Sequence, residues 1–311
     1  MMQATVSSVA FAVLFAGGVT AAEPADNACH RTSTAAQTAC EADGKDNRWI
    51  AVGSCFNLAD DAARQQCIAD AKDAQTEQGQ ECRAQFDARE SLCAALGQAP
   101  YDPVIDPTNF NSPQQTAAQP NPFFPLVPGK QWVYKGGGEK DTVTVTDKTK
   151  LILDVTATEV HDVVTDETGQ TTIEDTLDWF AQDLQGNVWY MGEAAQQFEN
   201  GRATGVEGSF TGGVERAKPG IVMEAVRKVG DVYRQEFSLG NAEDAGEVIS
   251  ITGSAIVPAA SCNGDCLKTL DFSPLEPDAE ENKYYKSGVG LILEVDLASG
   301  VRNELFSFTG P

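Results

Sequence analysis

Six of the eight cysteines in this 311-residue chain are spaced symmetrically. The intervals between successive members are 11, 15, 12, 15 and 11 residues. Because 11 residues of α-helix rise about 16 Å and return to nearly the same face, equal intervals on two antiparallel helices place cysteines side by side. The spacing predicts a helical hairpin that bends at Asp60-Asp61. The expected disulfides are Cys29–Cys93, Cys40–Cys82 and Cys55–Cys67.

Other roles for the cysteines are less favoured. Zinc sites usually use CxxC spacing, which does not occur here, and His30 is not expected to be a ligand. Gly44 and Gly53 bracket part of the first arm, so a three-helix arrangement with other pairings stays open. Cys262 and Cys266 enclose a short turn and predict a local disulfide, with a redox-active pair as the alternative.

A run of acidic residues near position 240 is the second candidate for chemistry. Carboxylates and loop carbonyls are the ligands that Ca²⁺ prefers, so the run is a candidate calcium site, and calcium is the one cofactor considered. Paired carboxylates could instead act as acid and base in glycoside cleavage. A solvated acidic loop is the ordinary interpretation. The candidate ligands are Glu236, Glu243, Asp244 and Glu247, with Asp175, Asp178 and Asp183 expected nearby.

Known catalytic motifs are missing elsewhere in the chain. It contains no P-loop and no GxSxG pattern, and an EF-hand aligned on Gly169 would place its first ligand at Val164. His161 lies among strand residues and is expected to be a surface or packed side chain. We therefore assign no catalytic residue.

Export explains why disulfides are expected. Residues 1–22 resemble a cleavable signal peptide, with an apolar stretch before small residues, and no stretch is long enough to span a membrane. A periplasmic or extracellular location follows, and it favours disulfides over free thiols. The net charge of −24 disfavours nucleic acid and anionic lipid as partners and favours cations.

Composition divides the mature chain into three parts. Residues 23–97 form the cysteine-rich helical hairpin, 98–122 an extended Pro-rich linker, and 123–311 an antiparallel β-barrel or sandwich, so the fold class is α+β. Turns at 166–172, 185–187 and 298–300 separate the expected strands. Half of the alternating aromatic residues should face inward, where they form a filled core or, in an open barrel, line an apolar pocket.

The β region also carries a resemblance. The segments FPLVPGKQWVYKGG, DWFAQDLQGNVWYMGE and KYYKSGVGLILEV resemble a family of exported bacterial β proteins, over residues 123–308. The opening FPL…G…WVY and the closing GVGLI are also similar to exported curved-sheet proteins. Those proteins are compared with open-barrel carriers of lipid-like ligands. The resemblance implies an exported β domain and no catalytic residues.

Three functions follow in order of preference. The first is a non-catalytic binding protein for a small apolar molecule, a cation or an exported partner protein. The second is a structural or adhesive cell-envelope component whose hairpin docks a partner. The third is a carboxylate-based hydrolase. A carrier should have a concave pocket in the β region, whereas an interaction protein should have a filled barrel and an exposed apolar patch.

Overall fold

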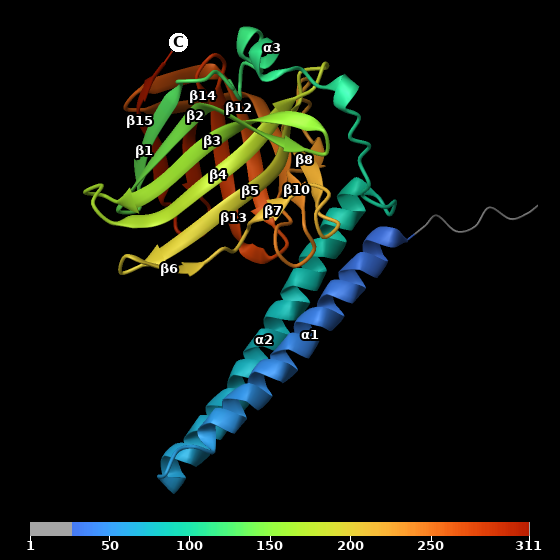
Figure 1. The fold of residues 1–311 in the computed structure, drawn as a ribbon, viewed down its shortest axis with the longest axis vertical. Helices are drawn as coiled ribbons and strands as arrows, with labels where there is room; N and C mark the ends of the chain where they lie inside the picture. The colour runs from blue at the N-terminus through green and yellow to red at the C-terminus, as the bar shows by residue number, and fades with distance from the viewer. Residues whose placement is uncertain (1–26, 311) are drawn as a thin grey trace, which may run out of the picture.

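A computed structural model describes residues 27–310, and the expected signal peptide lies outside these residues. Two parts are evident in Figure 1: a long helical hairpin and a β-barrel from which the hairpin projects. The hairpin consists of α1 (Ala28–Cys55) and α2 (Asp61–Leu96). The fold is therefore α+β, as the composition predicts.

The hairpin confirms the disulfide ladder. Cys29–Cys93, Cys40–Cys82 and Cys55–Cys67 are all bonded, each with 5.7 Å between its Cα atoms. The Asp60 carboxylate accepts a hydrogen bond from the Ala63 amide at 2.7 Å and caps α2. The bend thus lies where the cysteine spacing places it.

The first arm does not break at its glycines. α1 continues through Gly44 and Gly53, so the three-helix alternative is not adopted. A Cβ at Gly44 would lie 3.1 Å from the Gln78 side chain, so glycine lets the two helices approach closely there. Apart from the cysteines, the helices bury few large apolar side chains, which makes the disulfides the main link between them.

The Pro-rich segment lies along the barrel. It contains the 3₁₀-helix η1 (Pro107–Asn109) and the short helix α3 (Pro113–Ala118). The Asn111 amide donates to the Gln182 carbonyl at 3.0 Å, and Asn121 Nδ2 donates to the Gly186 carbonyl at 2.8 Å. The expected extended linker is therefore a partly helical strap: Asp106 and the Ser112–Gln115 capping box begin its two helical turns, and the bonds to the barrel hold it in place.

The β region is one antiparallel sheet of fifteen strands, in which the expected turns at 166–172, 185–187 and 298–300 are confirmed. The strands are β1 (Gln131–Gly136), β2 (Glu139–Ile152), β3 (Val155–Asp166), β4 (Thr172–Gln182), β5 (Val188–Glu199), β6 (Arg202–Gly205), β7 (Phe210–Thr211), β8 (Lys218–Met223), β9 (Val232–Arg234), β10 (Glu236–Phe237), β11 (Ala245–Val257), β12 (Ala260–Ser273), β13 (Glu276–Lys286), β14 (Gly290–Asp296) and β15 (Arg302–Thr309).

Residues 232–237 bring the two ends of the sheet together. β9 pairs with β11 at one end of the strand order, and β10 pairs with β8 at the other. Only Gln235 separates β9 from β10, so one short segment carries both pairings. The sheet therefore curls into a nearly closed barrel (Figure 1), and the two-sheet sandwich is not formed.

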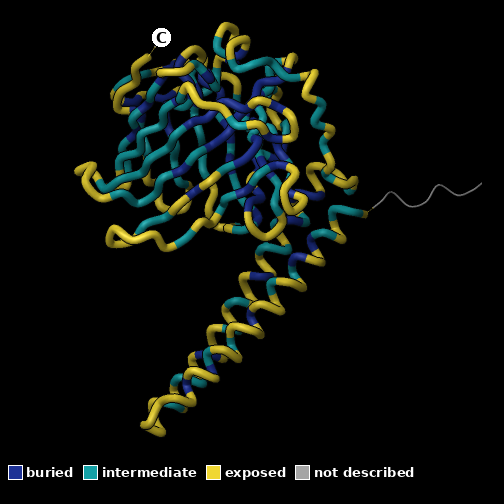
Figure 2. The backbone as a smooth tube through the Cα atoms, viewed as in Figure 1, coloured by how far each residue is buried: buried dark blue, intermediate teal, exposed yellow. Residues whose placement is uncertain are grey.

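Alternation along the strands separates the lumen from the outer surface. Trp132, Tyr134 and Phe180 belong to the inner cluster. Trp179 belongs to an outer cluster, against which Phe110 of the strap packs. The dark blue positions of Figure 2 show this burial concentrated in the barrel.

The fourth disulfide is confirmed, but its setting differs from the expected turn. Cys262 and Cys266 are bonded within strand β12, where the pairing to β11 is irregular. Gly264 between them has φ of +81°, which lets the strand bulge without steric cost. Both cysteines are buried while residues 263–265 between them are exposed, so this disulfide fixes the base of an outward bulge to the core.

Replacing Cys40 and Cys82 tests the ladder. The C40A and C82A variants each lose the same disulfide, so either should lower the free energy of unfolding by about 2–4 kcal/mol. The double variant should cost little more than one single variant. Urea unfolding followed by helical circular dichroism measures all three, and C262A/C266A serves as the control that leaves the hairpin intact. Additive losses would contradict the pairing.

Candidate functional site

The barrel lumen changes from apolar to acidic along its length. Inward positions of β2 run from Val145 through Val143 to Asp141, and β14 runs from Ile292 to Glu294 in the same direction through the barrel. Among residues 27–310, a cavity of about 350 Å³ is lined by eight carboxylates and one lysine. The carboxylates are Asp141, Asp162, Asp178, Glu193, Glu236, Asp244, Asp271 and Glu294.

Aromatic and aliphatic side chains line the other end of the lumen. Phe180 stacks on Tyr190 with ring centroids 4.7 Å apart, and Phe124 packs on Phe180 at 4.9 Å. The Trp132 indole N–H donates to the Val289 carbonyl at 2.8 Å, which satisfies its one polar atom. This end of the lumen is therefore an apolar surface, and its tryptophan has no polar atom left without a partner.

Two lumen carboxyls face each other across adjacent strands. Asp178 of β4 pairs directly with Glu193 of β5, and both contact the Tyr190 hydroxyl, the latter at 2.8 Å. A hydroxyl has one hydrogen and can donate to only one carboxylate. The second contact therefore needs a protonated carboxyl that donates to the tyrosine oxygen. The pair is stable when it holds a proton or a neighbouring cation.

Burial disfavours the ionised form of these acids. It raises the pKa of Glu193 to about 7 and holds the pKa of Asp178 well above its usual range. Burial, with the neighbouring Asp162 carboxyl, also raises the pKa of Asp141 to about 10. Within the described residues, one oxygen each of Asp141, Asp162 and Glu236 has no hydrogen-bond donor. Glu236 therefore presents an acceptor without a partner, whereas Asp141 and Asp162 can share one proton in a hydrogen bond between them.

Lys283 is the one basic side chain among the described lumen residues. Its Nζ lies 3.5 Å from Asp271, 3.6 Å from Glu281 and 3.9 Å from Glu294. These carboxylates raise the pKa of Lys283 against the opposing effect of burial. One ammonium is already shared among three acids, so it does not neutralise the Asp178–Glu193 side of the lumen.

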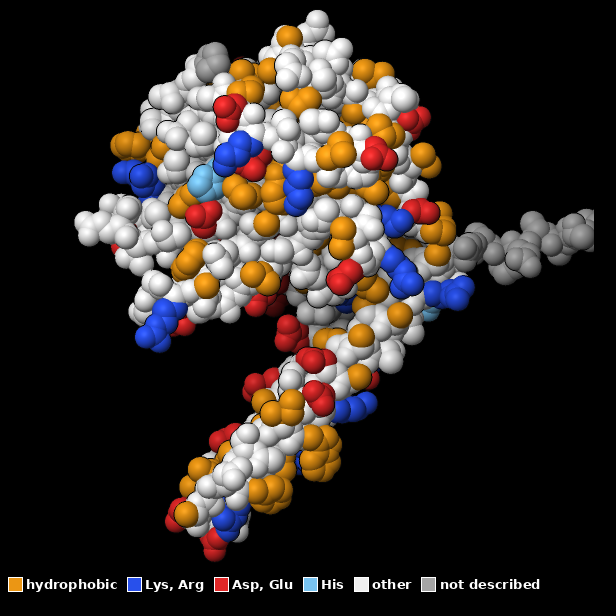
Figure 3. Space-filling view, viewed as in Figure 1, with side chains coloured by type: hydrophobic (Ala, Val, Ile, Leu, Met, Phe, Trp, Pro, Cys, Tyr) orange, Lys and Arg blue, Asp and Glu red, His pale blue; other side chains and the backbone are white. Residues whose placement is uncertain are grey.

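The acidic end opens toward the hairpin. Further acids, including Glu207 and Glu276, line a wider space of about 420 Å³ that shares Glu193 and Asp244 with the lumen. Helix α2 passes this rim, where Gln85 Nε2 donates to the Leu275 carbonyl at 3.0 Å. Figure 3 shows acidic side chains gathered where barrel and hairpin meet.

The four predicted metal ligands do not form one site. Glu236 and Asp244 line the lumen. Glu243 is 1 % exposed and accepts two hydrogen bonds from Arg89, and Glu247 precedes the inward Val248 and so faces outward. No three acid, histidine or cysteine groups converge on a metal position within residues 27–310.

The three acids expected near these ligands also lie in different parts of the barrel. Asp178 lies in the lumen, whereas Asp175 pairs with His161 at 2.8 Å on part-exposed surface. Asp183 accepts hydrogen bonds in the β4–β5 turn, from Asn187 among others.

Sequence reasoning missed five of the lumen acids. They are Asp141, Asp162, Glu193, Asp271 and Glu294. A usable signal was the alternation of an acid with inward apolar residues, as in Asp141, Val143 and Val145. Such an acid can face only the lumen if the strand keeps its period of two.

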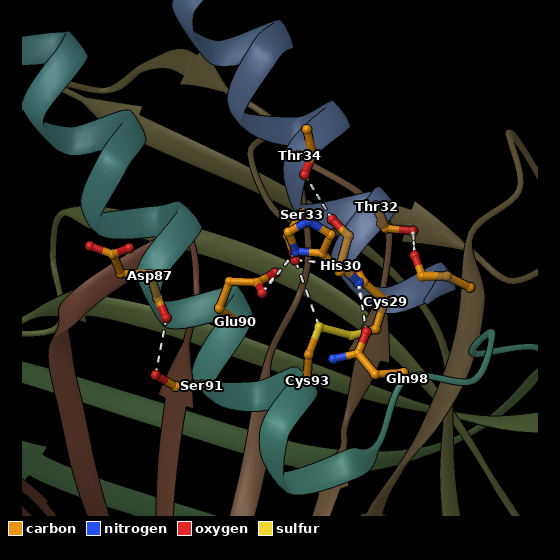
Figure 4. Close-up of polar contacts among 11 residues, drawn as sticks. Cys29, His30, Thr32, Ser33, Thr34, Asp87, Glu90, Ser91, Cys93 and Gln98 are labelled. Atoms are coloured by element: carbon orange, nitrogen blue, oxygen red, sulfur yellow. Dashed lines mark hydrogen bonds and ion pairs between the residues drawn. A yellow bond between two sulfur atoms is a disulfide. The ribbon is translucent and has the colours of Figure 1, made fainter. Parts of the chain in front are cut away.

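The hairpin carries polar contacts at its base and apolar side chains at its far end. Near the barrel, His30 Nδ1 lies 2.9 Å from Glu90 Oε2, next to the Cys29–Cys93 disulfide (Figure 4). The described helices include none that is long and apolar enough to cross a membrane. The exposed apolar side chains toward the bend are Trp49, Ile50, Phe56 and Leu58.

No protein-family model, curated protein or solved structure matches this chain. The geometry and charge of the lumen are therefore the features that indicate a function.

Replacing Glu193 by glutamine should stabilise the protein above neutral pH. The pKa of Glu193 is raised from 4.5 to about 7, so the folded state binds this proton more tightly than the unfolded state. The proton's contribution to the free energy of unfolding is therefore present below pH 4.5 and lost as pH rises through 7. E193Q should gain about 2–3 kcal/mol over the wild type at pH 8 and much less at pH 4.5.

Urea unfolding at several pH values measures this difference. E247Q removes the same charge outside the lumen and is the matched control. A stability gain in E193Q that does not change between pH 4.5 and 8 contradicts the raised pKa.

Proposed function

We propose that the protein is an exported binding protein for a small lipophilic cation, such as an amine attached to an apolar body. The observation that carries the proposal is the lumen of about 350 Å³, with carboxylates at one end and aromatic side chains at the other. Four disulfides accord with an oxidising compartment, and the periplasm or cell exterior is the proposed location.

The excess of carboxylates in the lumen indicates that the ligand is positively charged. Like-charged carboxyls opposite each other, as in Asp178 and Glu193, destabilise a sheet unless a proton or a cation intervenes. An ammonium group supplies positive charge and three donors, which suit the unpartnered oxygen of Glu236 and can replace the proton shared by Asp141 and Asp162. The apolar end, with Phe124, then holds the body of the ligand.

The apolar end also separates this ligand from a bare metal ion. A hydrated cation makes no use of the stacked Phe180 and Tyr190 rings, whereas an alkyl or aromatic amine buries surface against them. The opening FPL…G…WVY and closing GVGLI segments, which are similar to exported curved-sheet proteins that are compared with open-barrel carriers, point in the same direction.

Two other functions are supported less well. An interaction protein fits the exposed hairpin residues such as Trp49 and Phe56, but it gives no role to the acidic lumen. A hydrolase fits Glu193, because a carboxyl with a pKa near 7 can act as a general acid. Glycoside cleavage uses two carboxyl groups, whereas the acidic end of the lumen has eight.

Octylamine is a suitable probe, with octanol as the neutral compound of the same chain length. Calorimetry on the wild-type protein should show saturable binding of octylamine that is at least tenfold tighter than that of octanol. Affinity should rise from pH 6 to 8, because the ammonium competes with protons on Glu193 and its neighbours. Proton release should make the measured heat depend on the buffer.

The D178N variant tests the acidic end directly. Losing a charge-assisted contact worth about 1.5–3 kcal/mol should weaken octylamine binding by about tenfold or more. E247Q, outside the lumen, should bind like the wild type. Equal affinities for octylamine and octanol, or equal effects of D178N and E247Q, would overturn the proposal.

A further inference from the structure

A second cavity lies outside the barrel, where the hairpin base meets β8 and β9. Its volume is about 410 Å³, and its lining combines hairpin residues, residues 97–103 and strand residues. Cys29, which forms the disulfide seen in Figure 4, and the neighbouring Ser33 are part of its hairpin wall. None of the lumen carboxylates described above lines this cavity.

Two buried arginines line this cavity, one from the hairpin and one from the barrel. Arg89 of α2 is 3 % exposed and Arg234 of β9 is 7 % exposed. Arg89 donates through Nε and Nη2 to the two oxygens of Glu243, at 2.9 and 2.8 Å. Arg89 Nη1 and both Nε and Nη1 of Arg234 are buried without an acceptor among the described residues.

The cavity has an excess of positive charge. Glu243 is the one carboxylate in its described lining, and its oxygens already accept from Arg89 and from the Gly240 amide at 2.7 Å. Burial raises the pKa of Tyr101 to about 12, so this phenol stays neutral, and its hydroxyl donates to the Pro219 carbonyl.

The nearby groups do not supply the missing negative charge. Asp102 pairs with Lys218, and Glu90 pairs with His30. Burial and Arg89 lower the pKa of Arg234 while Glu243 raises it, yet a guanidinium keeps its proton in proteins. An unpartnered buried guanidinium is costly, so an anion in this cavity would relieve that cost.

The walls around the arginines are mostly apolar. Leu96, Trp189 and Ile221 line the cavity, and the Arg234 guanidinium lies 4.6 Å from the Phe237 ring centroid and 5.5 Å from that of Tyr101. The rings hold the guanidinium in place through cation–π contacts. Its free Nε and Nη1 lie on different edges of the guanidinium, so one of them can donate to a carboxylate oxygen while Arg89 Nη1 donates to the other oxygen.

We propose that this outer cavity binds a small organic anion, a monocarboxylate with an apolar body, whose carboxylate lies against Arg234 and Arg89 Nη1. The ligand has the charge opposite to that of the lumen ligand. The two sites lie on opposite faces of the same strand segment, since Arg234 faces outward while Glu236 faces the lumen.

Octanoate tests the proposal against octanol and octylamine on the full mature chain. The wild-type protein should bind octanoate at least tenfold more tightly than octanol at pH 7.5, by calorimetry. The R234M variant keeps the apolar contacts but lacks the guanidinium, so its octanoate affinity should fall at least tenfold. R234K, which keeps the charge without the planar fork, should show an intermediate loss.

Two controls make the outcome specific. K228M removes an exposed cation that does not line the cavity and should leave octanoate binding unchanged. Octylamine binding tests the lumen separately, so failure of one site is distinguishable from failure of the other. Equal binding of octanoate and octanol by the wild type, which requires no variant, overturns the proposal. Undiminished octanoate binding by folded R234M or R234K also overturns it.

Discussion

The closure of the sheet by residues 232–237 is the constraint on which both candidate sites depend. β9 pairs with β11 and β10 pairs with β8, so this segment joins the two ends of a long sheet. Closure converts one face of the sheet into a lumen and removes its acids from bulk water. The same segment turns Arg234 outward and Glu236 inward, which gives each site one of its charged residues.

Burial of charge explains the character of the lumen. Carboxylates dispersed on an open sheet would be solvated and would titrate normally. Inside the barrel, desolvation raises the pKa values of Asp178 and Glu193, and Tyr190 can donate to only one of them. Lys283 offsets part of the negative charge near Asp271 and Glu294. The lumen therefore favours a proton or a cation.

The hairpin is stabilised in a different way from the barrel. Its two helices share few buried apolar side chains, and three disulfides link them at intervals along their length. Near its base, Arg89 connects α2 to the barrel through the buried ion pair with Glu243. The hairpin thus contributes a wall of the outer cavity, and the covalent ladder keeps that wall in place.

The sequence by itself determined the elements that depend on local spacing. The cysteine intervals predict all three hairpin disulfides, because helical geometry relates spacing to position. The period-two alternation and the turn residues predict the hairpins of the sheet, because strand geometry and turn geometry also depend on neighbouring residues. The α+β organisation also follows from composition.

Only the tertiary structure decided which charged residues meet. The run Glu236, Glu243, Asp244 and Glu247 is close in sequence, yet closure of the barrel distributes it between lumen, ion pair and outer surface. Asp141, Asp178 and Glu294 are far apart in sequence and line one cavity. Strand order and closure set these distances, and the burial that shifts the pKa values exists only once the chain is folded.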